Sequence, residues 1–259
     1  MSGRKILVLP DSHSQPDVSN DRYEWVGKMI IDHRPDIVVD LGDFADVPSL
    51  SSYDKGRKSH EGRRLLLDIQ AAVDARIKIT APLRALQARQ RVNKEKLYVP
   101  RLVALGGNHE FRINRLMNDS AEFDGLYTQD ISGAAQQGWE FHPFLEMVKI
   151  EGINFCHYFP SGVMGRPTGG ENPAKALINK MHSSCIAGHL HLLDYAEIGN
   201  QACGRIIGVV GGCFFEHNEG FAGPANAMYR RGLSLLHDVH DGVFDFEWVG
   251  MNRIRAEYA

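Results

Sequence analysis

The sequence predicts an α/β protein whose first half contains parallel strands and whose second half is largely antiparallel. Residues 5–10 and 36–41 are almost wholly apolar, as is typical of parallel strands that are buried on both faces. A helical pattern over 23–32 joins them, so we expect a right-handed βαβ unit. From residue 139 onwards the apolar runs are short and separated by turn residues, which favours antiparallel pairing. Because no linker or repeat interrupts the chain, we expect one domain over 1–259.

Further elements follow from local patterns. A short helix is expected directly after residue 110, and 161–170 is expected to be a loop because it is rich in glycine and proline. Asn172 and Pro173 are typical of the N-cap and first residue of a helix, which we expect to continue to about residue 181. The remaining strands are expected over 102–105, 139–142, 146–150, 153–158, 185–187, 195–198, 206–210, 233–236 and 243–248.

The composition excludes several classes of protein. With 43% hydrophobic and 24% charged residues, the 259-residue chain can bury a full core and is not of the disordered class. It contains no apolar run of about 18 residues, so we expect no membrane-spanning helix and no membrane partner. The first apolar run leads into Asp11 and His13 rather than into a cleavage site, which indicates a strand and not a signal peptide. The four cysteines lack zinc spacing and are expected to be reduced, which favours a cytoplasmic location.

A basic segment lies between the second and third predicted strands. Residues 55–101 contain thirteen Lys and Arg against four acidic residues, although the net charge of the whole chain is −3. Apolar residues recur within it at helical spacing, so we expect two helices, or one helix kinked at Pro82. We interpret the segment as a helical insertion around 55–100 that stands over one edge of the fold. Its charge either attracts a polyanion or belongs to a solvated helical face, and both alternatives remain open.

Five blocks of polar residues follow apolar strands. They are Asp11-x-His13, Gly42-Asp43-x-x-Asp46, Gly107-Asn108-His109-Glu110, His157 and Gly188-His189-x-His191. Ligands bind at the carboxyl ends of strands in open α/β sheets, so these blocks are expected to converge. In Asp-x-His and His-x-His, the spacing places both side chains on one side of an extended backbone. Oxygen and imidazole donors without thiolate are typical of sites for Mn, Fe, Zn or Ni.

The five blocks resemble the signature of the calcineurin-like metallophosphoesterase superfamily, which reads D-x-H, G-D, G-N-H-[D/E], H and G-H-x-H in that order. This resemblance implies a fold of two packed mixed β-sheets flanked by helices. It also implies two divalent metal ions, for which we favour manganese over iron, zinc or nickel. The first metal would be held by Asp11, His13 and His191, the second by Asn108, His157 and His189, and Asp43 would bridge both.

The resemblance also implies a reaction, the hydrolysis of a phosphoester. A hydroxide shared by the two metals would attack phosphorus in line. His109 would be the general acid for the leaving oxygen, and Asp46 would orient it through its other ring nitrogen.

One departure from the family's protein phosphatase branch concerns substrate binding. That branch continues its second block with an arginine that grips phosphate, whereas Val47 and Pro48 stand here, which disfavours a phosphoprotein phosphatase. His217 is a candidate for lining the substrate pocket. Guanidinium groups match phosphate oxygens well, although an ordinary surface role is the alternative for each arginine. Candidates for the missing cation are Arg112, Arg115 and Arg166.

Three functional hypotheses remain. We favour a phosphodiesterase or nuclease with a nucleotide or nucleic-acid substrate, because the basic segment would attract a polyanion. A phosphomonoesterase is the alternative within the same chemistry. A non-catalytic interaction module is less favoured, because such proteins usually lose metal ligands or the general acid and this chain retains both.

Overall fold

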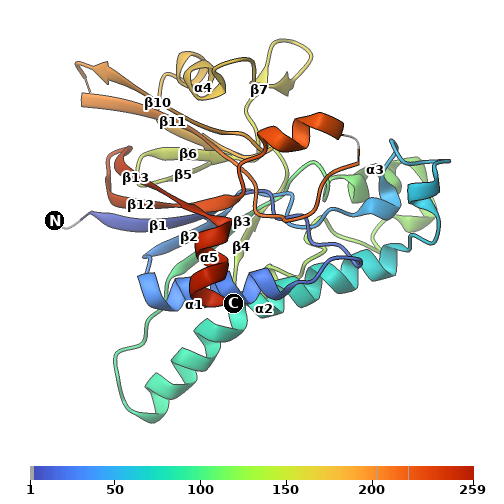
Figure 1. The fold of residues 1–259 in the computed structure, drawn as a ribbon, viewed down its shortest axis with the longest axis horizontal. Helices are drawn as coiled ribbons and strands as arrows, with labels where there is room; N and C mark the ends of the chain where they lie inside the picture. The colour runs from blue at the N-terminus through green and yellow to red at the C-terminus, as the bar shows by residue number, and fades with distance from the viewer. Residues whose placement is uncertain (1–2, 203, 221) are drawn as a thin grey trace.

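Two β-sheets are stacked face to face, and helices cover the outer side of each (Figure 1). The protein was analysed as a computed structural model, which describes residues 3–202, 204–220 and 222–259. Cys203, one of the four cysteines expected to be reduced, lies outside the described residues, whereas Cys156, Cys185 and Cys213 are buried free thiols. The mixed α/β fold with two packed sheets is therefore as predicted.

The larger sheet has six strands, and its centre is parallel. Strands β1 to β4 pair in parallel, while β12 is antiparallel to both β1 and β13. The parallel order confirms the predicted βαβ unit, in which α1 (Asp21–His33) connects β1 to β2. The strands lie in the order β13 (Val243–Gly250), β12 (Gly232–His240), β1 (Arg4–Leu9), β2 (Ile37–Asp40), β3 (Arg101–Leu105) and β4 (Glu140–His142).

The smaller sheet has five strands and is more parallel than the sequence suggested. Its outer pairs are antiparallel, but β6, β9 and β11 are parallel to one another. The reason is that β6 and β9 are joined through α4 (Pro173–Met181), and a crossover of this length allows parallel pairing. The strands lie in the order β10 (Leu193–Asn200), β11 (Gly204–Gly211), β9 (Cys185–Ala187), β6 (Ile153–Cys156) and β5 (Val148–Ile150). Within the predicted loop, β7 (Pro160–Ser161) and β8 (Arg166–Pro167) form a small hairpin.

Strand β1 shows how the two cores are divided. Ile6 and Val8 face the core between the sheets, whereas Leu7 and Leu9 face the core beneath the helices. This follows from the two-residue period of a strand, and all four side chains are at most 1% exposed. Burying each of these side chains contributes roughly 1.5–3 kcal/mol. The core that contains Leu7 and Leu9 is covered by three helices: α1, α2 (Leu65–Val92) and α5 (Met251–Tyr258).

Helix α2 agrees with one of the two alternatives for the basic segment, a single helix that contains Pro82, but it does not stand over an edge of the fold. It is one helix that continues through Pro82, and it packs beside α1 on the outer face of the larger sheet instead of standing over an edge. A Cβ on Gly27 of α1 would lie 2.7 Å from the Ile79 carbonyl oxygen and 2.8 Å from Pro82 Cγ. The two helices therefore cross in close contact, and this packing holds the proline within the helix. Residues 48–64 form turns with two 3-10 segments, Pro48–Leu50 and Lys58–His60.

A buried ion pair fixes α2 to the end of β2. Arg76 Nη2 lies 2.7 Å from Asp40 Oδ2, and both side chains are almost fully buried. The guanidinium carbon is 3.6 Å from the centre of the Phe44 ring and 4.6 Å from that of Trp139. The pair therefore sets the position at which the chain leaves β2.

The N-terminus of α4 corrects a second expectation. Pro173 is the first helical residue as predicted, but the Asn172 side chain makes no capping hydrogen bond. The Ala174 amide instead donates to Asp194 Oδ2 at 2.9 Å. A carboxylate from β10 thus satisfies the donor that a local cap would have satisfied. Among the described residues, no helix is both long and apolar enough to cross a lipid bilayer.

Candidate functional site

The five polar blocks converge where β1, β2, β3, β6 and β9 end. The loops that follow these strands are joined by main-chain hydrogen bonds. The Asp43 carbonyl accepts from the amides of Ser12 and His13 at 3.1 and 3.0 Å, and the Gly188 amide donates to the His157 carbonyl at 2.9 Å. Blocks that are far apart in sequence therefore share one rigid edge of the two sheets.

Two glycines allow these loops to touch. A Cβ on Gly107 would lie 2.0 Å from Asp43 Oδ1, and a Cβ on Gly188 would lie 2.6 Å from Asp11 Oδ2. Neither glycine has a positive φ, so their role is close approach and not a left-handed turn.

Glu110 binds the loops after β2 and β3 together. Its carboxylate accepts from the amides of Gly107 at 2.8 Å, Asp43 at 3.1 Å and Ala45 at 2.8 Å. Burial, with the nearby Asp43, raises the pKa of Glu110 to about 7. Its place in the Gly-Asn-His-Glu block was the only sequence signal of this role.

The seven predicted metal ligands come together, and six of them form two groups, with Asn108 beside the second. Asp43 Oδ2 lies 3.8 Å from His13 Nε2 and 3.3 Å from His157 Nε2. Asn108 Oδ1 lies 2.9 Å from His157 Nε2. In each group the donor atoms are within 4.8 Å of one another. The groups are Asp11, His13 and His191, and Asp43, His157 and His189.

Hydrogen bonds orient two of the imidazoles. His13 Nδ1 donates to Glu219 Oε1 at 2.7 Å, and His157 Nδ1 donates to the Leu41 carbonyl at 3.0 Å. The Nε2 atom of each ring is thereby directed at the cluster, as a metal ligand requires. His13 Nε2 is buried and has no hydrogen-bond partner within the described residues. An unsatisfied buried nitrogen is costly, so this atom fits a bound cation.

Burial and mutual charge shift the pKa values of the cluster in both directions. Burial raises the pKa of Asp11 to about 7. Burial raises the pKa of Asp43 as well, but neighbouring His109 and His157 outweigh it and hold that pKa well below its usual value. Burial and His157 lower the pKa of His189 to about 4. Burial lowers the pKa of His157, but Asp43 outweighs it and raises that pKa to about 9. Neutral imidazoles and ionised carboxylates are the forms that bind metals, so metal binding at His157 would release a proton.

Four of these candidate ligands have a left-handed backbone, which is uncommon outside glycine. The φ angles are 45° for His13, 49° for Asp43, 68° for His189 and 59° for His191. Such conformations cost roughly 1–2 kcal/mol each and collect at functional sites, where the surrounding contacts impose them. The strained backbone coincides with the group of ligands.

His109 and Asp46 form a pair at the mouth of the cluster. His109 Nδ1 donates to Asp46 Oδ1 at 2.8 Å, while its Nε2 lies 3.7 Å from Asp43 Oδ2. Burial raises the pKa of Asp46, but the hydrogen bond from His109 outweighs it and holds that pKa below its usual value. Asp46 therefore stays ionised and fixes which ring nitrogen of His109 faces the cluster.

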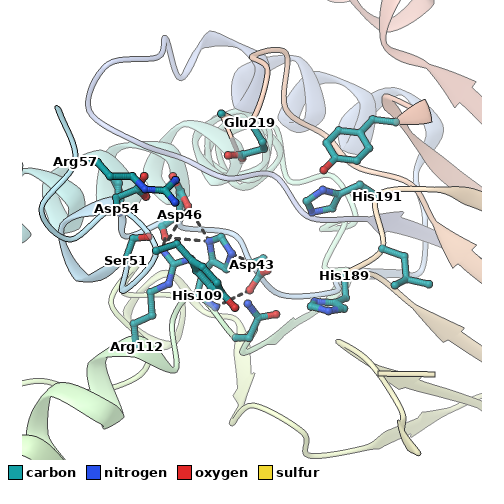
Figure 2. A pocket seen from close by; sticks show the side chains of 16 residues that line it. Asp43, Asp46, Ser51, Asp54, Arg57, His109, Arg112, His189, His191 and Glu219 are labelled. Atoms are coloured by element: carbon teal, nitrogen blue, oxygen red, sulfur yellow. Dashed lines mark hydrogen bonds and ion pairs between the residues drawn. The ribbon is translucent and has the colours of Figure 1, made fainter. Parts of the chain in front are cut away.

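A pocket of about 750 Å³ opens over both features. Figure 2 shows His109, Asp46 and Arg57 on one side of it and His189 and His191 on the other. Arg57 lies in the turns before α2 and lines the pocket. Sequence analysis had noted the positive charge of this segment but had not named Arg57 as a pocket residue.

Of the residues predicted to bind substrate, only Arg112 lines the main pocket. Arg112 lines the pocket, but its Nη1 donates to the Asp46 and Val47 carbonyls at 2.6 and 3.2 Å. Arg166 is exposed on β8 and lies outside the pocket lining, whereas Arg115 lines a neighbouring pocket. His217 does not line the main pocket, although its Nε2 lies 3.2 Å from Glu219 Oε1.

Comparison with protein families agrees with this geometry. The model of the calcineurin-like phosphoesterase family matches residues 4–193, which contain all five blocks. The chain belongs to this family, and it is accordingly a hydrolase that acts on phosphoester bonds. Members of the family use divalent metals, and both ligand groups described above lie within the matched region. No curated protein sequence matches the chain closely enough to count as a relative.

The chain is similar to several solved structures at low sequence identity. A phosphoesterase from E. coli, YfcE, is 13% identical with a TM-score of 0.38, and the match covers 96% of this chain and 100% of that one. A predicted phosphoesterase from Streptococcus pneumoniae is 12% identical with a TM-score of 0.36, covering 96% and 99%. The protein TT1561 from Thermus thermophilus is 11% identical with a TM-score of 0.35, covering 95% and 99%.

Proposed function

We propose that the protein is a binuclear metal-dependent phosphodiesterase that acts on a nucleotide or nucleic acid. The observation that carries this proposal is the position of Asp43 Oδ2, within 3.8 Å of His13 Nε2 and 3.3 Å of His157 Nε2. A carboxylate between two ligand groups is suited to two cations. One would be held by Asp11, His13 and His191, the other by Asn108, His157 and His189, with Asp43 shared between them.

The donor set favours manganese among the metals considered. Carboxylate, amide and imidazole ligands without thiolate suit Mn²⁺, although iron, zinc and nickel accept imidazole as well. When bound, two divalent cations lower the pKa of water toward neutrality and offset the negative charge of the phosphoryl group.

The chain itself supplies the proton for the leaving group. In hydrolysis the water oxygen forms a bond to phosphorus while the bond from phosphorus to the leaving oxygen breaks. That oxygen needs a proton, and protonated His109 donates it from Nε2, which faces the cluster. Asp46 keeps the opposite nitrogen, Nδ1, as a donor to its own carboxylate at 2.8 Å. Asp46 is therefore a positioning residue and His109 the general acid.

The pocket supports a substrate of nucleotide size. Its volume of about 750 Å³ is well above the space that a single phosphate needs. Tyr53 and Tyr229 line it together with Arg57, so rings and a cation are available beside the metal ligands. Aromatic rings and arginine together suit a base and its phosphates.

A phosphomonoesterase remains the second candidate, because Arg57 and Arg112 both line the pocket and two guanidinium groups suit a dianionic phosphate. The test is hydrolysis of bis(p-nitrophenyl) phosphate and of p-nitrophenyl phosphate by protein loaded with Mn²⁺. We expect kcat/KM for the diester to exceed that for the monoester by at least about tenfold, a difference of roughly 1.4 kcal/mol. A faster monoester would favour the phosphatase. Bound metal without any turnover of either ester would favour the interaction module.

A further inference from the structure

A second pocket, which we call the α3 pocket, adjoins the main one. It has a volume of about 300 Å³ and shares Ser51 and Arg112 with the main pocket. One wall is a single face of α3 (Arg112–Asp119), and the other is the chain from Ser49 to His60. Figure 1 shows α3 beside the segment that follows β2, in agreement with contacts between α3 and Pro48–Leu50. A ligand in the main pocket could therefore extend into the α3 pocket past Arg112.

The α3 pocket is lined by three cationic side chains, of which Arg112 is paired with Asp46. Lys55, Arg112 and Arg115 line it, and Asp119 is the one carboxylate among the described residues of its lining. Within the part of the chain that the structure describes, neither Lys55 nor Arg115 has an ion-pair partner or a side-chain hydrogen bond. Two such cations on facing walls are placed to receive an anion.

Two buried polar atoms in the same lining also lack partners. Ser49 Oγ and His60 Nδ1 are inaccessible to solvent, and neither has a hydrogen-bond partner among the described residues. Leaving a buried hydroxyl or ring nitrogen unpaired costs roughly 1–3 kcal/mol, so each of these atoms has capacity for a further hydrogen bond. Both can donate a hydrogen bond, and a phosphate offers several acceptor oxygens. Because both atoms are shielded from solvent, the stronger observation for an anion is the pair of exposed cations, Lys55 and Arg115.

We propose that the α3 pocket binds a second phosphate group of the substrate, one that is not cleaved. This inference rests on the proposed phosphodiesterase function and narrows it. The preferred substrate is a phosphodiester that carries a further phosphate, such as an oligonucleotide or a nucleotide with a terminal phosphate. The basic segment thereby contributes to recognition through Lys55 at its beginning, while exposed residues such as Arg84 on α2 do not line either pocket.

The kinetic test compares three thymidine dinucleotides with Mn²⁺-loaded enzyme: TpT, pTpT with a 5′ phosphate and TpTp with a 3′ phosphate. We expect kcat/KM to be about tenfold higher for at least one phosphorylated form than for TpT, as one charge-assisted contact would give. The variant Arg115→Gln should reduce this preference to less than about twofold. Arg84→Gln, a matched change at an exposed position outside both pockets, should retain the wild-type preference.

A binding test separates this proposal from the catalytic one. Titration calorimetry with metal-free protein should show tighter binding of the preferred dinucleotide than of TpT, and Arg115→Gln should abolish the difference. Equal kcat/KM for all three dinucleotides in the wild type, or the same loss in Arg84→Gln as in Arg115→Gln, would overturn the second phosphate site. Hydrolysis without any preference would overturn this inference alone, whereas phosphate-dependent binding without hydrolysis would overturn the phosphodiesterase and leave the site standing.

Discussion

Glu219 Oε1 lies 2.7 Å from His13 Nδ1, although the two residues are 206 positions apart. The carboxylate holds the ring so that His13 Nε2 faces Asp43 and His191 instead of solvent. If His13 binds a metal as proposed, Glu219 would be its hydrogen-bond partner, and such partners set both the orientation and the basicity of a ligand.

Replacing Glu219 should therefore weaken metal binding. We expect Glu219→Ala to lower the affinity for Mn²⁺ by roughly 10–100-fold, because the His13 ring is no longer held. Calorimetric titration with Mn²⁺ measures this. Glu216→Ala is the matched control, since that carboxylate lies in the same loop but pairs with Arg255. Equal affinities in the Glu219 variant and the wild type would show that the contact does not orient a ligand.

His109→Ala should separate chemistry from metal binding. The variant is expected to keep both metals but to lose turnover by roughly 10²–10⁴-fold, because the leaving oxygen lacks its proton donor. The loss should be largest with alkyl leaving groups and smaller with p-nitrophenolate, which needs less protonation. Asp46→Asn should share this leaving-group dependence with a smaller loss, since Asp46 only positions His109. Full activity of His109→Ala on an ester with a poor leaving group would refute the role.

Gly107→Ala should disrupt the site through a steric clash. The added methyl would lie 2.0 Å from Asp43 Oδ1, so the loops after β2 and β3 must separate. We expect a destabilisation of roughly 1–3 kcal/mol together with loss of Mn²⁺ binding. Gly199→Ala provides the control, because a methyl there would meet no atom within 4 Å. Thermal unfolding and metal titration of both variants test this expectation, and a Gly107 variant with wild-type metal affinity would contradict it.

Replacing Arg76 should destabilise the protein, and a second substitution at its partner Asp40 should restore part of the lost stability. Arg76→Met leaves the Asp40 carboxylate buried without its cation, at an expected cost of roughly 3–5 kcal/mol. The double variant Arg76→Met with Asp40→Asn should recover much of that loss, since the uncompensated charge is gone. Urea unfolding gives the free energy of unfolding of Arg76→Met, of Asp40→Asn and of the double variant. Arg84→Met is an exposed control on the same helix. A double variant as unstable as the sum of its single changes would argue against a charge effect.

The sequence predicted the layout of the site best where strands determine it. Asp11, Asp43 and His157 each follow an apolar strand, and the strand ends fix where those side chains begin. The alternation of Ile6 and Leu7 between two cores is likewise a direct consequence of strand geometry.

The residues that sequence analysis missed act through tertiary contacts. Glu219 and Arg57 lie in irregular segments, where no periodicity indicates the direction of a side chain. Asp194 replaces Asn172 at the N-terminus of α4 because a neighbouring strand brings a carboxylate there. A single helix through Pro82 was one of two alternatives that the sequence left open, but its close contact with Gly27 of α1 depends on tertiary packing. Local pattern carries no information about such partners until the chain is folded.

The protein is expected to bind two metal ions, one on either side of Asp43. Anomalous diffraction from a crystal of the protein grown with Mn²⁺ tests this expectation most directly. We predict two peaks, one next to Asp11, His13 and His191 and the other next to Asn108, His157 and His189, with the Asp43 carboxylate between them. A single peak, or none within reach of Asp43, would contradict the account.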